Sequence, residues 1–68
     1  MKDDAKKLGE NLKKIRTNKN ITQTVLAETL GVDKSFVSNI ENGKTNPTLS
    51  TITNLAQALG VSTNELLK

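Results

Sequence analysis

Apolar side chains recur every three or four residues along most of the chain, which is the spacing of one face of an α-helix. In the first segment the apolar residues share one face and lysines fall on the other; the apolar set is Ala5, Leu8, Leu12 and Ile15. Four later segments follow the same spacing, and no run alternates as a strand would. The pattern therefore predicts an all-α fold in a single domain over residues 1–68. The predicted helices lie at about residues 5–18, 23–30, 34–42, 49–59 and 63–67.

Residues that start or stop helices stand at the ends of these segments. Gly31, Gly43 and Gly60 each follow an apolar segment and suit the left-handed conformation that closes many helices. Polar side chains that can accept hydrogen bonds from the first free amides precede the helices. These predicted caps are Thr22, Asp33, Thr48 and Ser62, and Ser62 with Glu65 fits the capping-box pattern. The short connections then create two consecutive helix-turn-helix units.

The two units begin with similar sequences. Residues 22–32, TQTVLAETLGV, match residues 51–61, TITNLAQALGV, at seven of eleven positions. We interpret the match as two helices closed by the same Leu-Gly-Val stop, with a common ancestry of the two segments as the alternative.

The composition excludes several classes of chemistry. The chain has no cysteine and no histidine, so it can form no disulfide, no thiolate or imidazole metal site, and no Cys/His or Ser/His nucleophilic pair. Apart from the adjacent Asp3 and Asp4, its acidic residues are spread singly, which is unlike a pair of catalytic carboxylates. We therefore expect a protein that is not an enzyme and that needs no metal or cofactor.

Charge and hydropathy indicate a soluble chain with an anionic partner. No apolar run is long enough to cross a membrane, and the charged segment MKDDAKKLGE does not resemble a signal peptide. We expect a cytoplasmic protein without membrane association. The net charge is +3, with the basic excess in the first 20 residues, which weakly favours a polyanion such as nucleic acid.

The third predicted helix carries a short polar face without acidic groups. At 100° per residue, one face within about 100° holds Ser35, Ser38, Asn39 and Asn42, whereas Val37, Ile40 and Phe36 point the opposite way. Serine and asparagine are weaker helix formers than lysine, glutamate or alanine, so helicity alone does not explain them. Asparagine can bind adenine through two hydrogen bonds and serine can donate or accept, which favours contact with base edges. The alternative is that exposed positions are simply polar.

Phe36, the only aromatic residue, allows two interpretations. Its position beside Val37 and Ile40 favours packing at the edge of the core. Contact with a thymine methyl group or a sugar is the alternative.

The segment ITQTVLAETLGVDKSFVSNIENGKTNPTLSTITNLAQALGVS resembles the Cro/repressor-type helix-turn-helix family of phages and bacteria, also called the xenobiotic response element family. The resemblance extends over about residues 8–67. It implies a compact five-helix bundle like the lambda-repressor DNA-binding domain, with the second and third helices as its helix-turn-helix. Its most specific pieces are Thr22-Gln23, Leu26-Ala27, Gly31-Val32, residues 35–40, Glu41-Asn42-Gly43-Lys44, Pro47 and residues 55–61.

The resemblance also implies roles for individual residues. Its base-contact positions correspond to Lys34, Ser35, Ser38 and Asn39. Its phosphate contacts correspond to Thr22, Gln23, Asn42, Lys44 and Thr45. Arg16 and Glu41 resemble a family ion pair that orients the third helix, and we expect Arg16 to be structural rather than a DNA contact.

These observations predict a sequence-specific double-stranded DNA-binding transcriptional regulator, and a repressor rather than an activator. One small domain reads few base pairs, so we expect a homodimer on a near-palindromic operator. We expect the dimer interface to be formed by Val61, Leu66 and Leu67. The contact should be weak, and dimerisation should become substantial only on DNA. We expect no small-molecule ligand. The alternative is an antitoxin-like protein-interaction module of the same fold whose DNA binding is secondary or lost.

Overall fold

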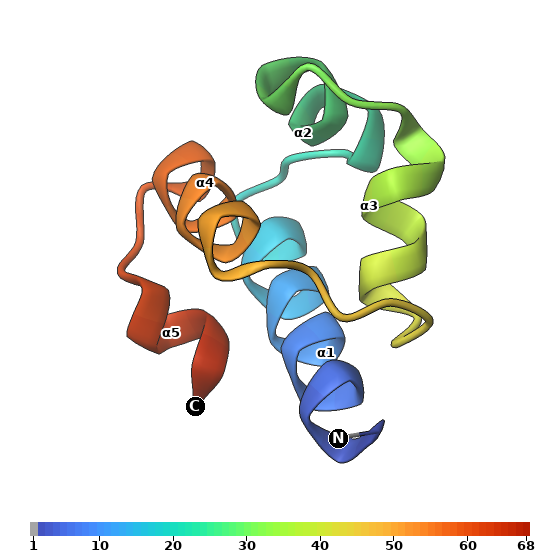
Figure 1. The fold of residues 1–68 in the computed structure, drawn as a ribbon. Coiled ribbons are helices and arrows are strands. Elements are labelled where there is room, and N and C mark those ends of the chain that lie inside the picture. The colour runs from blue at the N-terminus through green and yellow to red at the C-terminus, as the bar shows by residue number, and fades with distance from the viewer. Residues whose placement is uncertain (1) are drawn as a thin grey trace.

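The computed structural model of the protein describes residues 2–68, which form five helices and, within that range, no strand (Figure 1). The predicted all-α fold is confirmed. The helices are α1 (Lys2–Asn18), α2 (Gln23–Leu30), α3 (Lys34–Glu41), α4 (Leu49–Leu59) and α5 (Thr63–Leu67).

Two helix ends differ from the prediction. Helix α1 begins at Lys2 and not at residue 5, because residues 2–4 contain no proline or glycine and an aspartate near a helix N-terminus is favourable. Helix α3 ends at Glu41, since Asn42 has φ −89° and ψ 4° and serves as its C-cap.

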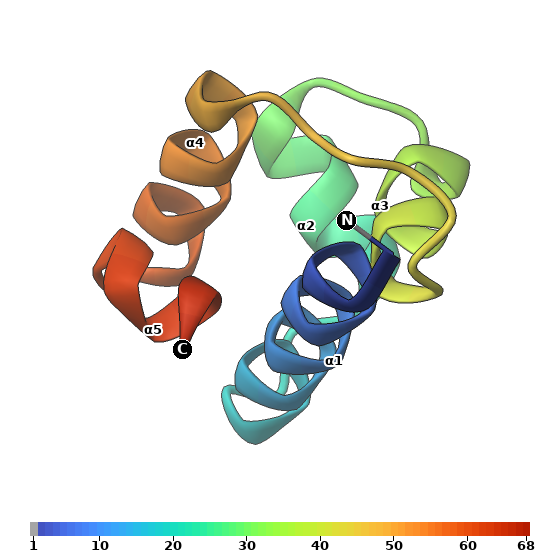
Figure 2. The same cartoon turned by 60° about the horizontal axis from the view of Figure 1, so that its bottom comes forward.

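Helix α1 lies in the middle of the molecule (Figures 1 and 2). Helices α2 and α3 pack together on one side of it, and α4 and α5 pack together on the other. Helix α1 contacts both α3 and α5, and α2 also contacts α4. The core is therefore a single aliphatic cluster shared by all five helices, as the spacing of apolar residues requires. Its members are Leu8, Leu12, Leu26, Ala27, Val37, Ile40, Ile52, Leu55, Ala56, Leu59 and Leu66.

The predicted helix stops and two of the four predicted caps are present. Gly31 and Gly60 adopt φ of 73° and 71°, the left-handed conformation that glycine adopts most readily. Thr22 Oγ1 accepts a hydrogen bond from the Val25 amide at 3.1 Å, and Thr48 Oγ1 accepts one from the Thr51 amide at 3.2 Å. Helices α2 and α4 therefore start and stop as predicted.

The side-chain caps predicted at Asp33 and Ser62 are wrong. Both residues occupy the N-cap position, but neither side chain makes a capping hydrogen bond. Their backbone carbonyls accept hydrogen bonds from the first turn of the helix instead. The Phe36 amide donates to the Asp33 carbonyl at 3.0 Å, and the Glu65 amide donates to the Ser62 carbonyl at 3.1 Å. The capping box with Glu65 is absent as well, since that carboxylate pairs with Lys68 at 3.2 Å.

Within residues 2–68, no helix combines the length and apolarity that crossing a bilayer requires.

Candidate nucleic-acid interface

Helix α3 presents two different faces. Val37 and Ile40 are buried in the core, which fixes the opposite face outward. On that outward face Lys34, Ser35 and Asn39 are exposed and Ser38 is half-buried. The four predicted base-contact residues therefore lie on one accessible helix, and none of them carries negative charge.

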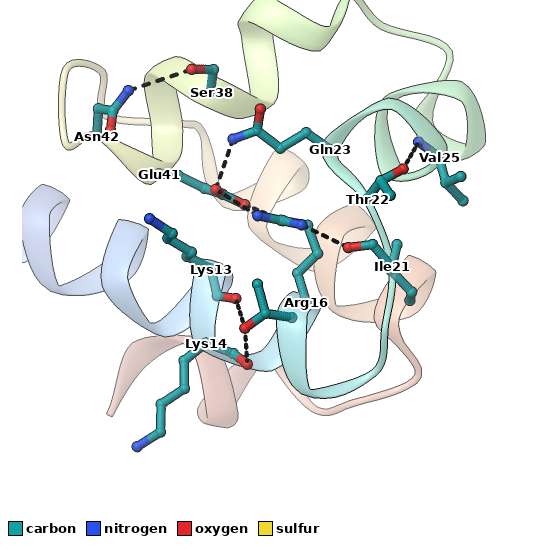
Figure 3. A network of polar contacts seen from close by, with 11 residues as sticks. Lys13, Lys14, Arg16, Ile21, Thr22, Gln23, Val25, Ser38, Glu41 and Asn42 are labelled. Atoms are coloured by element: carbon teal, nitrogen blue, oxygen red, sulfur yellow. Dashed lines mark hydrogen bonds and ion pairs between the residues drawn. The ribbon is translucent and has the colours of Figure 1, made fainter.

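Ser38 and Asn42 contact each other one turn apart at the end of this face. The Asn42 side-chain amide donates to the Ser38 hydroxyl oxygen at 3.4 Å (Figure 3). The Ser38 hydroxyl hydrogen can still be donated to another acceptor. This contact links the helical face to the loop that follows it.

The loop after α3 turns back sharply and places Lys44 and Thr45 beside the polar face. Gly43 has φ 71°, and the amide of Lys44 donates to the Asn39 carbonyl at 2.9 Å. Lys44 and Thr45 are exposed, as backbone-contact residues would have to be. The predicted loop contacts thus lie next to the predicted base contacts.

The fold also brings Lys6 to this loop, a residue that the sequence interpretation did not select. Lys6 lies on α1 and lines a surface hollow together with Asn42, Lys44 and Thr45. The approach is close, because a Cβ built on Gly43 would lie 3.1 Å from the Lys6 Cα. The spacing of lysines along α1 does not indicate this contact, because it arises only from the packing of α1 against the loop.

A buried network fixes α3 relative to α1 and α2 (Figure 3). Arg16 Nε donates to Glu41 Oε2 at 2.6 Å, and Arg16 Nη2 donates to Glu41 Oε1 at 3.2 Å. Arg16 Nη1 donates to the Ile21 carbonyl at 2.6 Å. Both charged residues are only 8% exposed, so the ion pair predicted from the resemblance is present and Arg16 faces the protein interior.

Gln23 completes this network at the start of α2. Its side-chain amide donates to Glu41 Oε1 at 2.9 Å, which couples the first turn of α2 to the last turn of α3. Gln23 is half-buried, whereas the neighbouring cap Thr22 is exposed. Gln23, which the resemblance implied as a phosphate contact, thus also braces α2 against α3.

Gly9 is a further positioning residue that the sequence interpretation missed. A Cβ at this position would lie 2.3 Å from the Ile40 carbonyl oxygen and 2.6 Å from that of Glu41. Helix α1 can approach the end of α3 this closely only because Gly9 has no side chain. The signal in the sequence was a glycine inside a helical pattern, which costs about 1 kcal/mol relative to alanine and therefore calls for a packing reason.

Comparison with known proteins agrees with this arrangement. A family model described as helix-turn-helix matches residues 12–66, nearly the whole chain. The chain belongs to the helix-turn-helix family. The resemblance inferred from the sequence is therefore confirmed.

Relatives of this helix-turn-helix protein include regulators and controller proteins. The SPbeta prophage-derived HTH-type transcriptional regulator YonR of Bacillus subtilis is 47% identical over 60 residues, which cover 88% of this chain and 56% of YonR. The restriction-modification controller protein C.AhdI from Aeromonas hydrophila superposes with a TM-score of 0.89 at 39% identity, covering 94% of this chain and 97% of C.AhdI.

A second solved structure is a complex with DNA. The controller protein C.Esp1396I, as a tetramer with its natural 35 base-pair operator, superposes with a TM-score of 0.79 at 30% identity. The superposition covers 94% of this chain and 95% of that one. The chain thus matches C.AhdI and C.Esp1396I over nearly their full length, but spans little more than half of YonR.

The three residues predicted to form a dimer interface differ in their exposure to solvent. Leu66 is 0% exposed, so its assignment to an interface is wrong. Helix α5 turns Leu66 into the core, and the Asn11 side chain donates to the Leu66 carbonyl at 2.9 Å, which holds α5 against α1. Val61 is half-buried and packs against the same core. Of the three residues only Leu67, 50% exposed, presents a largely free apolar surface.

Phe36 lies beside Ser35 and Asn39 and is 38% exposed. Most of its surface is covered, and the core residue Ile40 lines the second hollow that Phe36 lines. Its position therefore fits packing at the edge of the core and leaves part of the residue accessible to a partner.

Proposed function

We propose that this protein is a sequence-specific double-stranded DNA-binding transcriptional regulator whose helix α3 reads base edges in the major groove. The observation that supports the proposal best is the exposed, non-acidic face of α3, held in place by the buried Arg16–Glu41–Gln23 network. A helix fits the major groove, and hydrogen-bonding side chains on a rigid helix can distinguish base pairs.

Each side chain on this face has a chemical counterpart on DNA. Asn39 is exposed and can bond adenine N6 and N7 together, while Lys34 can donate to guanine O6 and N7. Ser35 and Ser38 can donate or accept, so they adapt to either kind of base edge. The face therefore supplies sequence discrimination, and the residues around it supply affinity.

Phosphate contact is assigned to residues that flank the reading face. Lys44, Thr45 and Asn42 lie on the loop after α3, and Lys6 lies across the hollow from them. Thr22 and Gln23 stand at the start of α2, where free amides favour an anion. Contacts of this type fix the register of a protein on the duplex without reading its sequence.

The regulator acts as a homodimer in this proposal. Two copies related by a two-fold axis would set their α3 helices about 34 Å apart, one turn of DNA, so that both enter successive major grooves. The exposed Leu67 on α5 is the remaining candidate among the predicted interface residues. Assembly of C.Esp1396I as a tetramer on its operator supports association on DNA in this family.

Selection from random duplexes tests the proposed function directly. We expect enrichment of two inverted half-sites spaced by about one helical turn. No enrichment, together with no salt-dependent binding to random duplex, would instead support the protein-interaction module considered from the sequence.

Asn39→Ala separates base reading from backbone contact. We expect binding to the selected operator to weaken by about 1–3 kcal/mol, with nearly unchanged affinity for random duplex, because the bidentate contact with adenine is lost. Gel-shift titrations on both duplexes measure the two affinities. An equal loss on both would make Asn39 a phosphate contact.

Lys44→Ala is the matched variant for the phosphate contact. We expect it to weaken operator and random-duplex binding alike and to reduce the slope of log K against log salt by about 1. Titrations at several salt concentrations give the slope, and an unchanged slope would remove Lys44 from the interface.

Leu67→Glu tests the proposed interface. Since Leu67 is half exposed, the monomer should keep its fold, while two-site cooperativity on the operator is lost and binding to an isolated half-site is retained. Sedimentation and gel-shift titration report the two effects. Retained cooperativity would place the interface on another surface.

A further inference from the structure

The ring of Phe36 lies within the reading face rather than behind it. Phe36 and Asn39 together line two adjoining surface hollows. One hollow is bounded by the turn before α3 and by Ser35, and the other by the loop after α3 and the start of α4 around Pro47. The ring and the Asn39 amide therefore form a shared ridge between the two hollows.

Phe36 is 38% exposed on this surface. A partner that covers the exposed part gains the favourable burial of apolar surface. The ring has no hydrogen-bonding group, so its favourable contacts on DNA are with apolar groups, either of the sugars or of the bases. In the major groove the apolar group that base pairs present is the 5-methyl of thymine.

The helical spacing defines where that thymine lies. Phe36 and Asn39 are three residues apart on α3, which separates them by about 4.5 Å along the helix axis. Two side chains this close together can reach the same or neighbouring base pairs when α3 lies in the major groove.

We propose that Phe36 is a specificity-determining residue that contacts the 5-methyl group of a thymine in, or next to, the base pair that Asn39 reads. The inference rests on the proposed DNA-binding function. It predicts an operator half-site in which an adenine for Asn39 and a thymine for Phe36 lie within one base pair of each other.

Replacing thymine by deoxyuridine tests the inference, because the exchange removes the methyl group and leaves every hydrogen-bonding atom in place. Each thymine of one half-site of the selected operator is replaced in turn, and the ratio of the two affinities is measured by gel-shift titration. For the unaltered protein we expect one position at which deoxyuridine weakens binding about fourfold, the loss of one buried methyl group.

The same ratio is then measured with two variants whose folding is checked by thermal melting. Phe36→Ala should bring the ratio at that position to about 1. Leu49→Ala removes another exposed apolar side chain, on α4, where Leu49 is 72% exposed, and should keep the fourfold ratio.

The outcomes separate this inference from the proposed function. If no operator is selected, the DNA-binding function itself fails. If an operator is selected but deoxyuridine is tolerated at every position, Phe36 contacts no thymine methyl, and the inference is overturned even should Phe36→Ala not fold. A ratio that persists in folded Phe36→Ala would assign the methyl contact to another residue.

Discussion

The two helix-turn-helix units share the same turn but carry very different second helices. In the first unit the Val32 amide donates to the Ala27 carbonyl, and in the second the Val61 amide donates to the Ala56 carbonyl, both at 3.0 Å. Beyond the turn, α3 has eight residues and an exposed polar face, whereas α5 has five. The shared turn therefore determines how the first helix of each unit ends. The residues after the turn determine whether the second helix is long enough and polar enough to present a binding face.

The comparison also explains the sequence match between the units. The match pairs Thr22 with Thr51, but Thr22 caps α2 while Thr51 lies inside α4, three residues after the cap Thr48. The two segments are equivalent in their later halves, where Leu26 and Leu55 are both buried in the core and the Leu-Gly-Val ends close the helices in the same way. They differ at their starts, so the match reflects a similar second half and stop of a helix.

Helix α1 supports the two second helices by different means. It holds α3 through the Arg16–Glu41 ion pair and the close approach at Gly9. It holds α5 through Leu66 in the core and one hydrogen bond from Asn11. Helix α3 therefore has a buried ion pair to α1 in addition to its core residues Val37 and Ile40, whereas α5 relies on Leu66 and one hydrogen bond.

Breaking the ion pair should give the largest effect. Arg16→Met leaves Glu41 buried without its cationic partner, and removal of one member of a buried pair costs about 3–5 kcal/mol. Urea unfolding measures the loss of stability, and operator binding should fall with it because α3 loses its orientation. Glu41→Gln, which keeps the shape, should shift both in the same direction. A variant that melts normally but binds poorly would show that Arg16 contacts DNA.

Leu66→Ala tests the apolar attachment of α5. The side chain is fully buried, and truncation of such a leucine costs about 2–5 kcal/mol. Leu67→Ala, one residue on and half exposed, should change stability by less than about 0.5 kcal/mol. Thermal melting of both variants gives the two losses of stability. Similar losses at the two positions would contradict the conclusion that Leu66 is buried and Leu67 is not.

Local patterns in the sequence were sufficient to predict the five helices and the exposed polar residues of α3. The spacing of apolar residues identified Val37 and Ile40 as the buried side of α3. The polar residues on the opposite side of the helix were then expected to be exposed. The stops at Gly31 and Gly60 were predictable because glycine readily adopts the left-handed conformation they need.

Contacts between distant segments were not predictable in the same way. The approach of Lys6 to the loop and of Gly9 to α3 depends on how α1 packs, which no local pattern encodes. For the same reason apolar spacing could not tell that α5 turns Leu66 inward and Leu67 outward, since a five-residue helix offers less than two turns of pattern. The Arg16–Glu41 pair was predicted only through the family resemblance.

The smallest predicted effect concerns the helix caps. In each unit a polar residue precedes both helices, but only the side chain before the first helix, α2 or α4, makes a capping hydrogen bond. Thr48 Oγ1 accepts from the Thr51 amide, so Thr48→Ala should lower stability by about 1 kcal/mol, and Thr48→Ser should restore most of it. Ser62 makes no such bond, because the Glu65 amide donates to its backbone carbonyl.

Ser62→Ala should therefore change the free energy of unfolding by only a few tenths of a kcal/mol, within the range of ordinary surface substitutions. Denaturant titrations of the three variants under one condition resolve the difference. If Ser62→Ala destabilised the protein as much as Thr48→Ala, the hydroxyl would cap α5 in solution. The second helices of the two units would then differ in their starts as well as in their lengths and outward faces, because the Asp33 side chain makes no capping hydrogen bond to α3.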